Sequence, residues 1–245
     1  MSFNAHQLLE QLRTQNRYRD VRTVTPVSPT QVLIDGRRVH LFSGNDYLGL
    51  SGHPSVKAAL VNAAGAHGMG PRGAALICGY TDEHAALESE LAVLKGTESA
   101  LLFPTGFQTN LGLLSALGSP DTDFFSDALN HASIIDGCRL AKGQVFVYGH
   151  RDMNHLELLL KQSTAQIKVV VTDALFSMDG TLAPLSEIVS LCQSYGAIIV
   201  LDEAHSTLVF GKNGGGVAEH FGLADQVDFH VGTLSKAMGT HGGFI

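Results

Sequence analysis

Three side chains with complementary chemistry follow two apolar runs in the second half of the sequence. Asp202 directly follows the run Ile198–Leu201, His205 comes three residues later, and Lys236 lies just beyond the run Phe229–Gly232. A carboxylate can hold a positive charge, an imidazole can move a proton, and a primary amine can form a Schiff base with an aldehyde. Their spacing after apolar runs predicts that all three lie at the ends of strands.

The segment from Asp202 to His205 allows several interpretations by itself. Helicase-type NTPases carry acidic residues after a strand, but they also need a GxxxxGK[ST] phosphate loop, which this sequence lacks. Asp202, Glu203 and His205 are residue types that bind divalent metals, although no His-x-x-x-His or cysteine pair completes such a site. Asp202 could instead cap the next helix.

Lys236 supports a fourth interpretation. Alone, a lysine beyond a strand is usually a solvated surface charge, and His131 alone could be a capping or core histidine. Together with Asp202 and the glycine turn in Pro104–Asn110, they provide what pyridoxal 5′-phosphate (PLP) requires. The aldehyde needs a lysine, the pyridine nitrogen needs a carboxylate, and the phosphate needs amides and hydroxyls at a helix N-terminus.

These residues need a fold that brings distant segments together. Short apolar runs alternate with longer helical stretches, which is typical of a mainly parallel sheet covered by helices. Ligands of such sheets bind beyond the carboxyl ends of the strands. The predicted strands are Ala100–Phe103, Asp123–Ser126, Val145–Tyr148, Val169–Thr172, Ile198–Leu201 and Phe229–Gly232, and Gly242–Ile245 reads as the start of another.

The pattern predicts a separate N-terminal segment, residues 1–44, ahead of a large domain, residues 45–245. Leu8, Leu9 and Leu12 lie at helical spacing among polar residues. The elements expected in this segment are an amphipathic helix from Met1 to about Arg22, a loop at Pro26 and Pro29, and a hairpin of Gln31–Ile34 and Val39–Phe42 that turns at Asp35-Gly36.

The composition excludes several classes of protein. With 245 residues, 44% of them hydrophobic, the chain can bury a core of one domain or slightly more. A net charge of −7 argues against nucleic-acid binding, and no apolar run approaches the roughly 18 residues of a membrane span. The N-terminus has no apolar stretch of signal-peptide length. Cys78, Cys138 and Cys192 are widely spaced, so we expect reduced thiols in a cytoplasmic protein.

Seven segments resemble the α-oxoamine synthases, which are fold-type-I PLP enzymes. They occur in that family's order and cover nearly the whole chain. The resemblance implies a mixed, mainly parallel sheet between helices, with PLP as cofactor. The segments are NDYLGLSGHP (45–54), GMGPRGAALICGYTDEHAALE (68–88), PTGFQTN (104–110), SDALNHASIIDG (126–137), FSMDG (176–180), LDEAH (201–205) and GTLSKAMG (232–239).

The resemblance implies a reaction and a role for each site residue. Lys236 would form the Schiff base and move the α-proton of the amino acid, and Asp202 would keep the pyridine nitrogen protonated. His205 would donate to the phenolic oxygen of the ring, and His131 would stack on the ring and contact the substrate. Further cofactor contacts are implied at Gly106, Phe107, Ser177 and Thr233, and substrate contacts at Arg19 and Asn45.

Within the family, the sequence is most similar to the branch that condenses L-alanine with a pimeloyl thioester in biotin biosynthesis, with loss of CO2. A relative that uses other small substrates is the alternative. The family implies small-molecule substrates and a homodimer with a shared active site, without metal, nucleic acid or membrane.

The sequence departs from the family pattern in three places. Pro71-Arg72 and Ala75 alter the glycine-rich loop that reaches the neighbouring subunit, and Gly214–Gly216 replaces a segment that often carries an arginine. The resemblance would also continue past Ile245. We therefore expect the rest of the large domain and a small C-terminal domain to be missing, and a truncated chain without activity is a further alternative.

Overall fold

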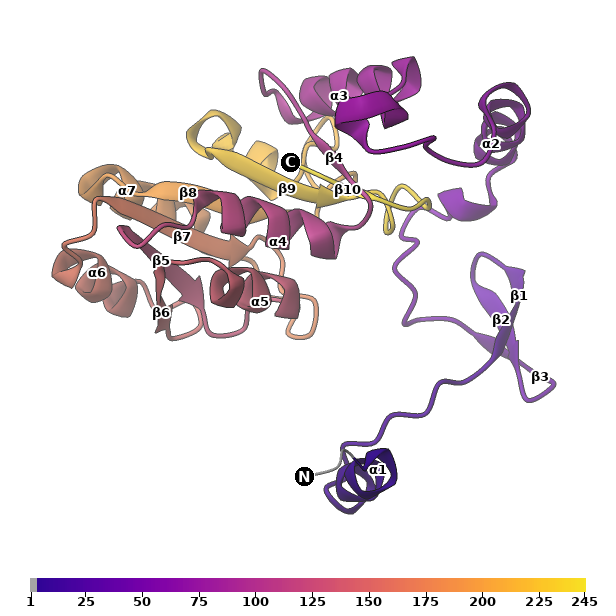
Figure 1. Ribbon diagram of the computed structural model, residues 1–245, viewed down its shortest axis with the longest axis horizontal. Coiled ribbons are helices and arrows are strands. Elements are labelled where there is room, and N and C mark those ends of the chain that lie inside the picture. The colour runs from indigo at the N-terminus through magenta and orange to yellow at the C-terminus, as the bar shows by residue number, and fades with distance from the viewer. Residues whose placement is uncertain (1–3) are drawn as a thin grey trace. The chain divides into compact units, whose positions relative to one another are not determined.

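The computed structural model describes residues 4–245, which divide into two compact units, Met1–Gly44 and Asn45–Ile245 (Figure 1). The first unit contains helix α1 and a three-stranded antiparallel sheet in the order β1-β2-β3. Its elements are α1 (Ala5–Thr14), β1 (Val24–Ser28), β2 (Gln31–Ile34) and β3 (Arg37–His40).

Helix α1 is shorter than the sequence predicts. The side chain of Asn4 caps its first turn by accepting a hydrogen bond from the Gln7 amide, and the helix ends at Thr14 instead of near Arg22. Asn16, just beyond it, has a φ of 53°, a left-handed conformation that ends a helix. Residues 1–3 of the predicted helix lie outside the described residues.

The hairpin turn is as predicted, but the strands around it differ. Asp35 and Gly36 both have positive φ, so two residues connect the strands and the second strand begins at Arg37 instead of Val39. The loop predicted at Pro26 is wrong, because Pro26 lies in β1. This strand forms an edge of the small sheet, where a missing N–H is tolerated, and its pairing shifts between Pro26 and Ser28.

The second unit is built on a seven-stranded mixed sheet in the order β4-β10-β9-β8-β7-β5-β6 (Figure 1). All six predicted strands are confirmed. The five strands from β9 to β6 are parallel, and β10 runs antiparallel between β4 and β9. The strands are β4 (Leu102–Phe103), β5 (Thr122–Asp127), β6 (Gln144–Tyr148), β7 (Ile167–Asp173), β8 (Ile198–Asp202), β9 (Phe229–Thr233) and β10 (Gly243–Phe244).

Helices cover both faces of this sheet, because successive strand side chains point to opposite faces. Phe124 packs under α4 (Gly106–Leu117) and α5 (Ala132–Leu140), whereas the adjacent Phe125 packs under α6 (Met153–Gln162) and α7 (Leu185–Tyr195). The remaining helices are α2 (Pro54–His67), α3 (Asp82–Lys95), α8 (Val217–His220) and short turns at Leu50–Gly52, Ala75–Gly79 and Ala224–Gln226. Within residues 4–245, no helix combines the length and apolarity of a membrane span.

The strand register determines which residues meet at the carboxyl edge of the sheet. Asp173, the last residue of β7, aligns with Asp202, the last residue of β8, and Asp202 aligns with Val231 in β9. The segments that follow these strands therefore emerge side by side.

We expect Leu114→Ala to lower the free energy of unfolding by about 2–5 kcal/mol, because it opens a cavity in the core. Leu114 is fully buried on α4 in the cluster that also contains Phe124 and Val169. Leu140→Ala, at an exposed position on α5, is the control and should change the free energy by no more than about 0.5 kcal/mol. Urea denaturation measures both, and equal effects would contradict this account of the core.

Candidate active site

A cavity of about 230 Å³ lies at the carboxyl edge of the large sheet. Its wall includes Asp173, Asp202 and Lys236. These residues lie at or just after the ends of β7, β8 and β9. A larger groove of about 950 Å³ along α2 contains none of these three residues. The other residues that line the cavity are Thr105, Gly106, Phe107, Asn110, His131, Ser133, Ala204, His205, Val231, Gly232, Thr233 and Ser235.

The amine and the imidazole are in direct contact. Lys236 Nζ lies 2.7 Å from Nε2 of His205, and the Tyr47 hydroxyl lies 2.6 Å from Nδ1 of the same ring. Burial and the nearby charge of Lys236 lower the pKa of His205 to about 4, so the ring is neutral at pH 7. With a single ring proton, His205 donates to one of these neighbours and accepts from the other.

Burial also lowers the pKa of the Lys236 ammonium, while the Asp202 and Asp173 carboxylates act in the opposite direction. A lowered pKa increases the fraction of free amine near neutral pH. The free amine is the form that attacks a carbonyl carbon.

The Asp202 carboxylate is 5% exposed and is held by two donors. Oδ1 accepts a hydrogen bond from the Ala204 amide at 2.9 Å, and Oδ2 accepts one from Asn110 Nδ2 at 2.7 Å. Asn110 Nδ2 also donates to the hydroxyl of Ser133 at 2.9 Å. Among residues 4–245, no group is bonded to the buried Oδ1 of Asn110, which leaves an acceptor in the cavity wall without a donor.

His131 enters the cavity from the start of α5. Its backbone amide donates to Asp173 Oδ2 at 2.7 Å, and its Nδ1 lies 2.7 Å from the Ser133 hydroxyl. Burial, followed by the charge of Asp202, raises the pKa of Asp173. The cavity therefore holds two buried carboxyl groups, an amine and two imidazoles.

The start of α4 provides a site for an anion. The amides of Gly106 and Phe107 make no hydrogen bond within the described part of the chain, and they stand at the positive end of a 12-residue helix. A Cβ atom at Gly106 would lie 3.1 Å from Cβ of Thr233, so glycine allows β9 to approach closely. The Thr233 hydroxyl donates to the Gly242 carbonyl at 2.9 Å.

The structure does not bring every predicted residue into this cavity. Ser177 lies on an exposed turn after β7 and is not part of the cavity wall. Arg19 is an exposed residue of the first unit. Asn45 reaches the site indirectly, since its Oδ1 accepts a hydrogen bond from the Tyr47 hydroxyl at 3.3 Å.

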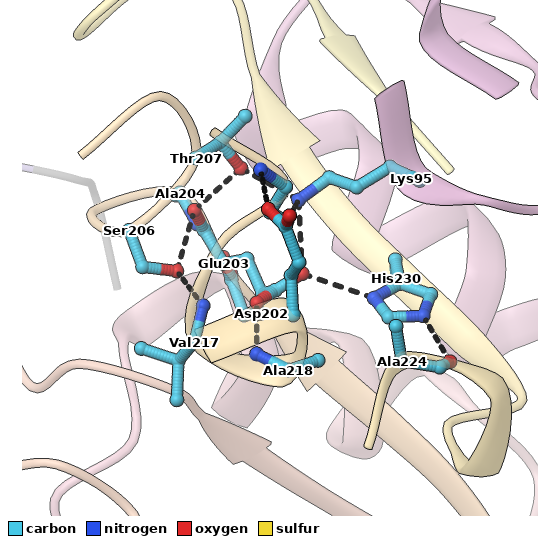
Figure 2. Close-up of polar contacts among 12 residues, drawn as sticks. Lys95, Asp202, Glu203, Ala204, Ser206, Thr207, Val217, Ala218, Ala224 and His230 are labelled. Carbon is cyan, nitrogen blue, oxygen red and sulfur yellow. Dashed lines mark hydrogen bonds and ion pairs between the residues drawn. The ribbon is translucent and has the colours of Figure 1, made fainter. Parts of the chain in front are cut away.

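The metal-binding interpretation does not fit the geometry. Asp202 and His205 line the cavity, but the Glu203 carboxylate is absent from its wall and instead binds Lys95 and His230 (Figure 2). The three side chains therefore do not converge on one point.

Four polar residues of the site were not singled out from the sequence. Asn110 follows Gly106 by one helical turn, a spacing that places both on the same side of α4 and could have revealed it. Asp173 directly follows the predicted strand Val169–Thr172, as Asp202 directly follows Ile198–Leu201. Ser133 and Tyr47 carry no comparable signal, because each acts through a neighbour that only the fold brings close.

Comparison with known proteins identifies the family of the chain. Residues 37–245 match the family described as aminotransferase class I and II. The chain belongs to this family. It is 54% identical over 227 residues to the 8-amino-7-oxononanoate synthase of Arabidopsis thaliana, an alignment that covers 85% of this chain and 48% of that protein.

Two solved structures extend the comparison. A Sphingomonas wittichii serine palmitoyltransferase superposes with a TM-score of 0.90 at 37% identity, covering 98% of this chain and 60% of that one. An 8-amino-7-oxononanoate synthase from Francisella tularensis superposes with a TM-score of 0.70 at 31% identity, covering 83% and 56%. Both are α-oxoamine synthases, so the predicted family resemblance and fold class are confirmed. The chain spans roughly half to three-fifths of the length of these relatives.

We expect Lys236 to react with an amine-specific reagent at lower pH than an exposed lysine, because its lowered pKa leaves more free amine. Acetylation of the cofactor-free protein from pH 6 to pH 11, followed by peptide mass spectrometry, compares it with exposed Lys161. The midpoint for Lys236 should be at the lower pH. A midpoint at or above that of Lys161 would contradict the assignment of Lys236 as a reactive amine.

Proposed function

We propose that the native protein is a PLP-dependent acyltransferase with 8-amino-7-oxononanoate synthase activity. The observation that carries this proposal is that the amine of Lys236 and the buried carboxylate of Asp202 line one cavity, beside two amides at a helix N-terminus that make no hydrogen bond within the described residues. The identity of 54% to a relative of that name supports the choice within the family.

The donors and acceptors of the cavity fit PLP. Asp202 would pair with the pyridine nitrogen, and the amides of Gly106 and Phe107 would receive the phosphate, whose negative charge suits a helix N-terminus. Thr233 lines the same cavity, and the free Oδ1 of Asn110 offers a further acceptor. Ser177 remains a proposed contact. When bound, PLP supplies an electron sink for negative charge at the α-carbon of an amino acid.

The residues around the cavity would control protons. Lys236 would take the α-proton, because its lowered pKa makes the free amine available. His205 would hold a hydrogen bond without adding charge, since its pKa of about 4 keeps it neutral at pH 7. His131 would cover the bound ring and contact the substrate, fixed in place by its backbone bond to Asp173.

The proposed substrates are L-alanine and a pimeloyl thioester. A carbon–carbon bond forms between the α-carbon of alanine and the thioester carbonyl carbon. The carbon–sulfur bond breaks to release the thiol, and the alanine carboxylate leaves as CO2. Arg19 and Asn45 are the proposed substrate contacts.

A different α-oxoamine synthase activity is the second candidate. The superposition on serine palmitoyltransferase, at a TM-score of 0.90, supports it. Assays with alanine, glycine and serine against acetyl, pimeloyl and palmitoyl thioesters distinguish the two candidates.

We also propose that two copies associate in the cytoplasm. Helix α2 has no buried residue in the isolated chain, and its Leu60 and Val61 side chains are about two-thirds exposed. Leu76 and Ile77, in the loop that follows, are almost fully exposed. Contact between two copies would remove this apolar surface from water.

Borohydride reduction of the PLP-loaded native protein should place a pyridoxyl group on Lys236, found by peptide mass spectrometry, and Lys236→Ala should remove the label. The same preparation should release one thiol and one CO2 for each 8-amino-7-oxononanoate formed from alanine and pimeloyl thioester. A label on another lysine would refute the assignment of Lys236. If Lys236 is labelled but the protein turns over only a different pair of substrates, the proposed 8-amino-7-oxononanoate synthase activity is refuted. The assignment as a PLP-dependent enzyme then still holds.

A further inference from the structure

A third buried carboxylate lies next to the site but outside its cavity. Glu203 follows Asp202 in the sequence, is 0% exposed, and its side chain belongs to a polar cluster outside the cavity (Figure 2). Its Oε2 lies 2.9 Å from both Lys95 Nζ and His230 Nδ1, and its Oε1 accepts from the Ala218 amide at 3.0 Å. These donors come from α3, β9 and α8, so one carboxylate joins three elements.

Lys95 uses all three protons of its ammonium group. Besides Glu203, it donates to the Thr207 hydroxyl at 2.8 Å and to the Gly215 carbonyl at 2.7 Å. These contacts connect the cluster to the segment Gly214–Gly216. Gly216 has a φ of 111°, and a Cβ there would lie 2.8 Å from Cδ of Glu203. Only glycine is compatible with the carboxylate in this position.

His230 lies between two acceptors. Its Nδ1 faces the Glu203 carboxylate, and its Nε2 lies 3.0 Å from the Ala224 carbonyl. Each ring nitrogen of His230 therefore has a partner of its own. Burial by itself would raise the pKa of Glu203, but the hydrogen bond from His230 and the charge of Lys95 lower it to about 2.

The backbone of Glu203 shapes the turn that carries the site residues. Its amide donates to the Val231 carbonyl at 2.8 Å, and its carbonyl accepts from the amides of Ser206 and Thr207 and from the Thr207 hydroxyl. His205 lies inside this turn. The Ala204 amide, also in the turn, donates to Asp202.

Stability alone does not account for such a cluster. Burying charges costs hydration energy, and apolar residues of similar volume often fill a core equally well. What the cluster provides is fixed geometry, because hydrogen bonds are directional and the partners of the Glu203 carboxylate come from three different elements.

We propose that Lys95, Glu203 and His230 are positioning residues that hold the turn Asp202–His205 in the orientation the site needs, an inference that rests on the proposed function. None of the three touches the cavity in which the reaction would take place. They act through Asp202 and His205.

The test compares Glu203→Gln with Asp123→Asn in the native protein. Asp123 is also a buried carboxylate, which accepts a hydrogen bond from Ser163, but it lies at the amino end of β5, away from the carboxyl edge. Histidine-selective NMR of the cofactor-free protein reports the His205 ring. The circular dichroism of bound PLP reports cofactor orientation, and steady-state kinetics separate kcat from KM.

Glu203→Gln should shift the His205 ring signals, reduce the dichroism of bound PLP by more than half and lower kcat at least tenfold, with KM for the amino acid changed less than threefold. Asp123→Asn should lower the thermal unfolding midpoint without these effects. A folded Glu203→Gln protein with wild-type NMR, dichroism and kcat would overturn the proposal, as would the same losses in Asp123→Asn.

If Glu203→Gln does not fold, His230→Gln takes its place with the same readouts and the same criteria. A wild-type protein that gives no dichroism with PLP would refute the proposed function. In that case the shift of the His205 NMR signals between wild type and Glu203→Gln, measured in the cofactor-free protein, would decide the positioning proposal.

Discussion

Parallel pairing of β7, β8 and β9 places two aspartates and a lysine-bearing turn at one edge of the sheet, and the other residues of the site are arranged around these groups. Asp173 and Asp202 are both almost completely buried. A buried carboxylate is stable only when donors replace the water that it has lost. The start of α5 supplies such a donor to Asp173, and α4 supplies one to Asp202.

The need of these buried carboxylates for hydrogen-bond donors is met by the helices that begin around the site. Thr105 caps α4 with its hydroxyl, and this cap turns the first amides of the helix toward the cavity. Four residues after Gly106, Asn110 lies on the same side of the helix and donates a hydrogen bond to Asp202. One helix therefore offers an anion site at its first turn and a carboxylate donor at its second.

The three buried carboxyl groups in and next to the site differ in their electrostatic environment. Asp202 keeps two strong donors, whereas burial and the proximity of Asp202 raise the pKa of Asp173. The Glu203 side chain lies outside the cavity and contacts Lys95 and His230. Three adjacent buried acids are thus held by separate partners, and only two of them face the reactive amine.

The apolar runs predicted all six strands, and that prediction is confirmed. Asp202, His205, His131 and Lys236 follow those runs in the sequence and line one cavity, because a strand end fixes where the next residues lie. Their roles at the site stay a prediction. Tyr47 could not be found in this way, since it is 158 positions from His205 and meets it only in the folded chain. From the sequence alone, Lys95 is expected to be a solvent-exposed charge at the end of a helix. Pro26 is expected in a loop, because the sequence does not show that its strand is at the edge of a sheet.

The central claim is that the buried carboxyl group of Asp202 keeps the pyridine nitrogen of PLP protonated. Nitrogen NMR of the native protein loaded with PLP that carries ¹⁵N in the ring measures that proton directly. The account predicts the chemical shift of a pyridinium in the wild-type protein across pH 6–9 and that of a free pyridine in Asp202→Asn. A free pyridine shift in the folded wild-type protein at pH 7 would contradict it.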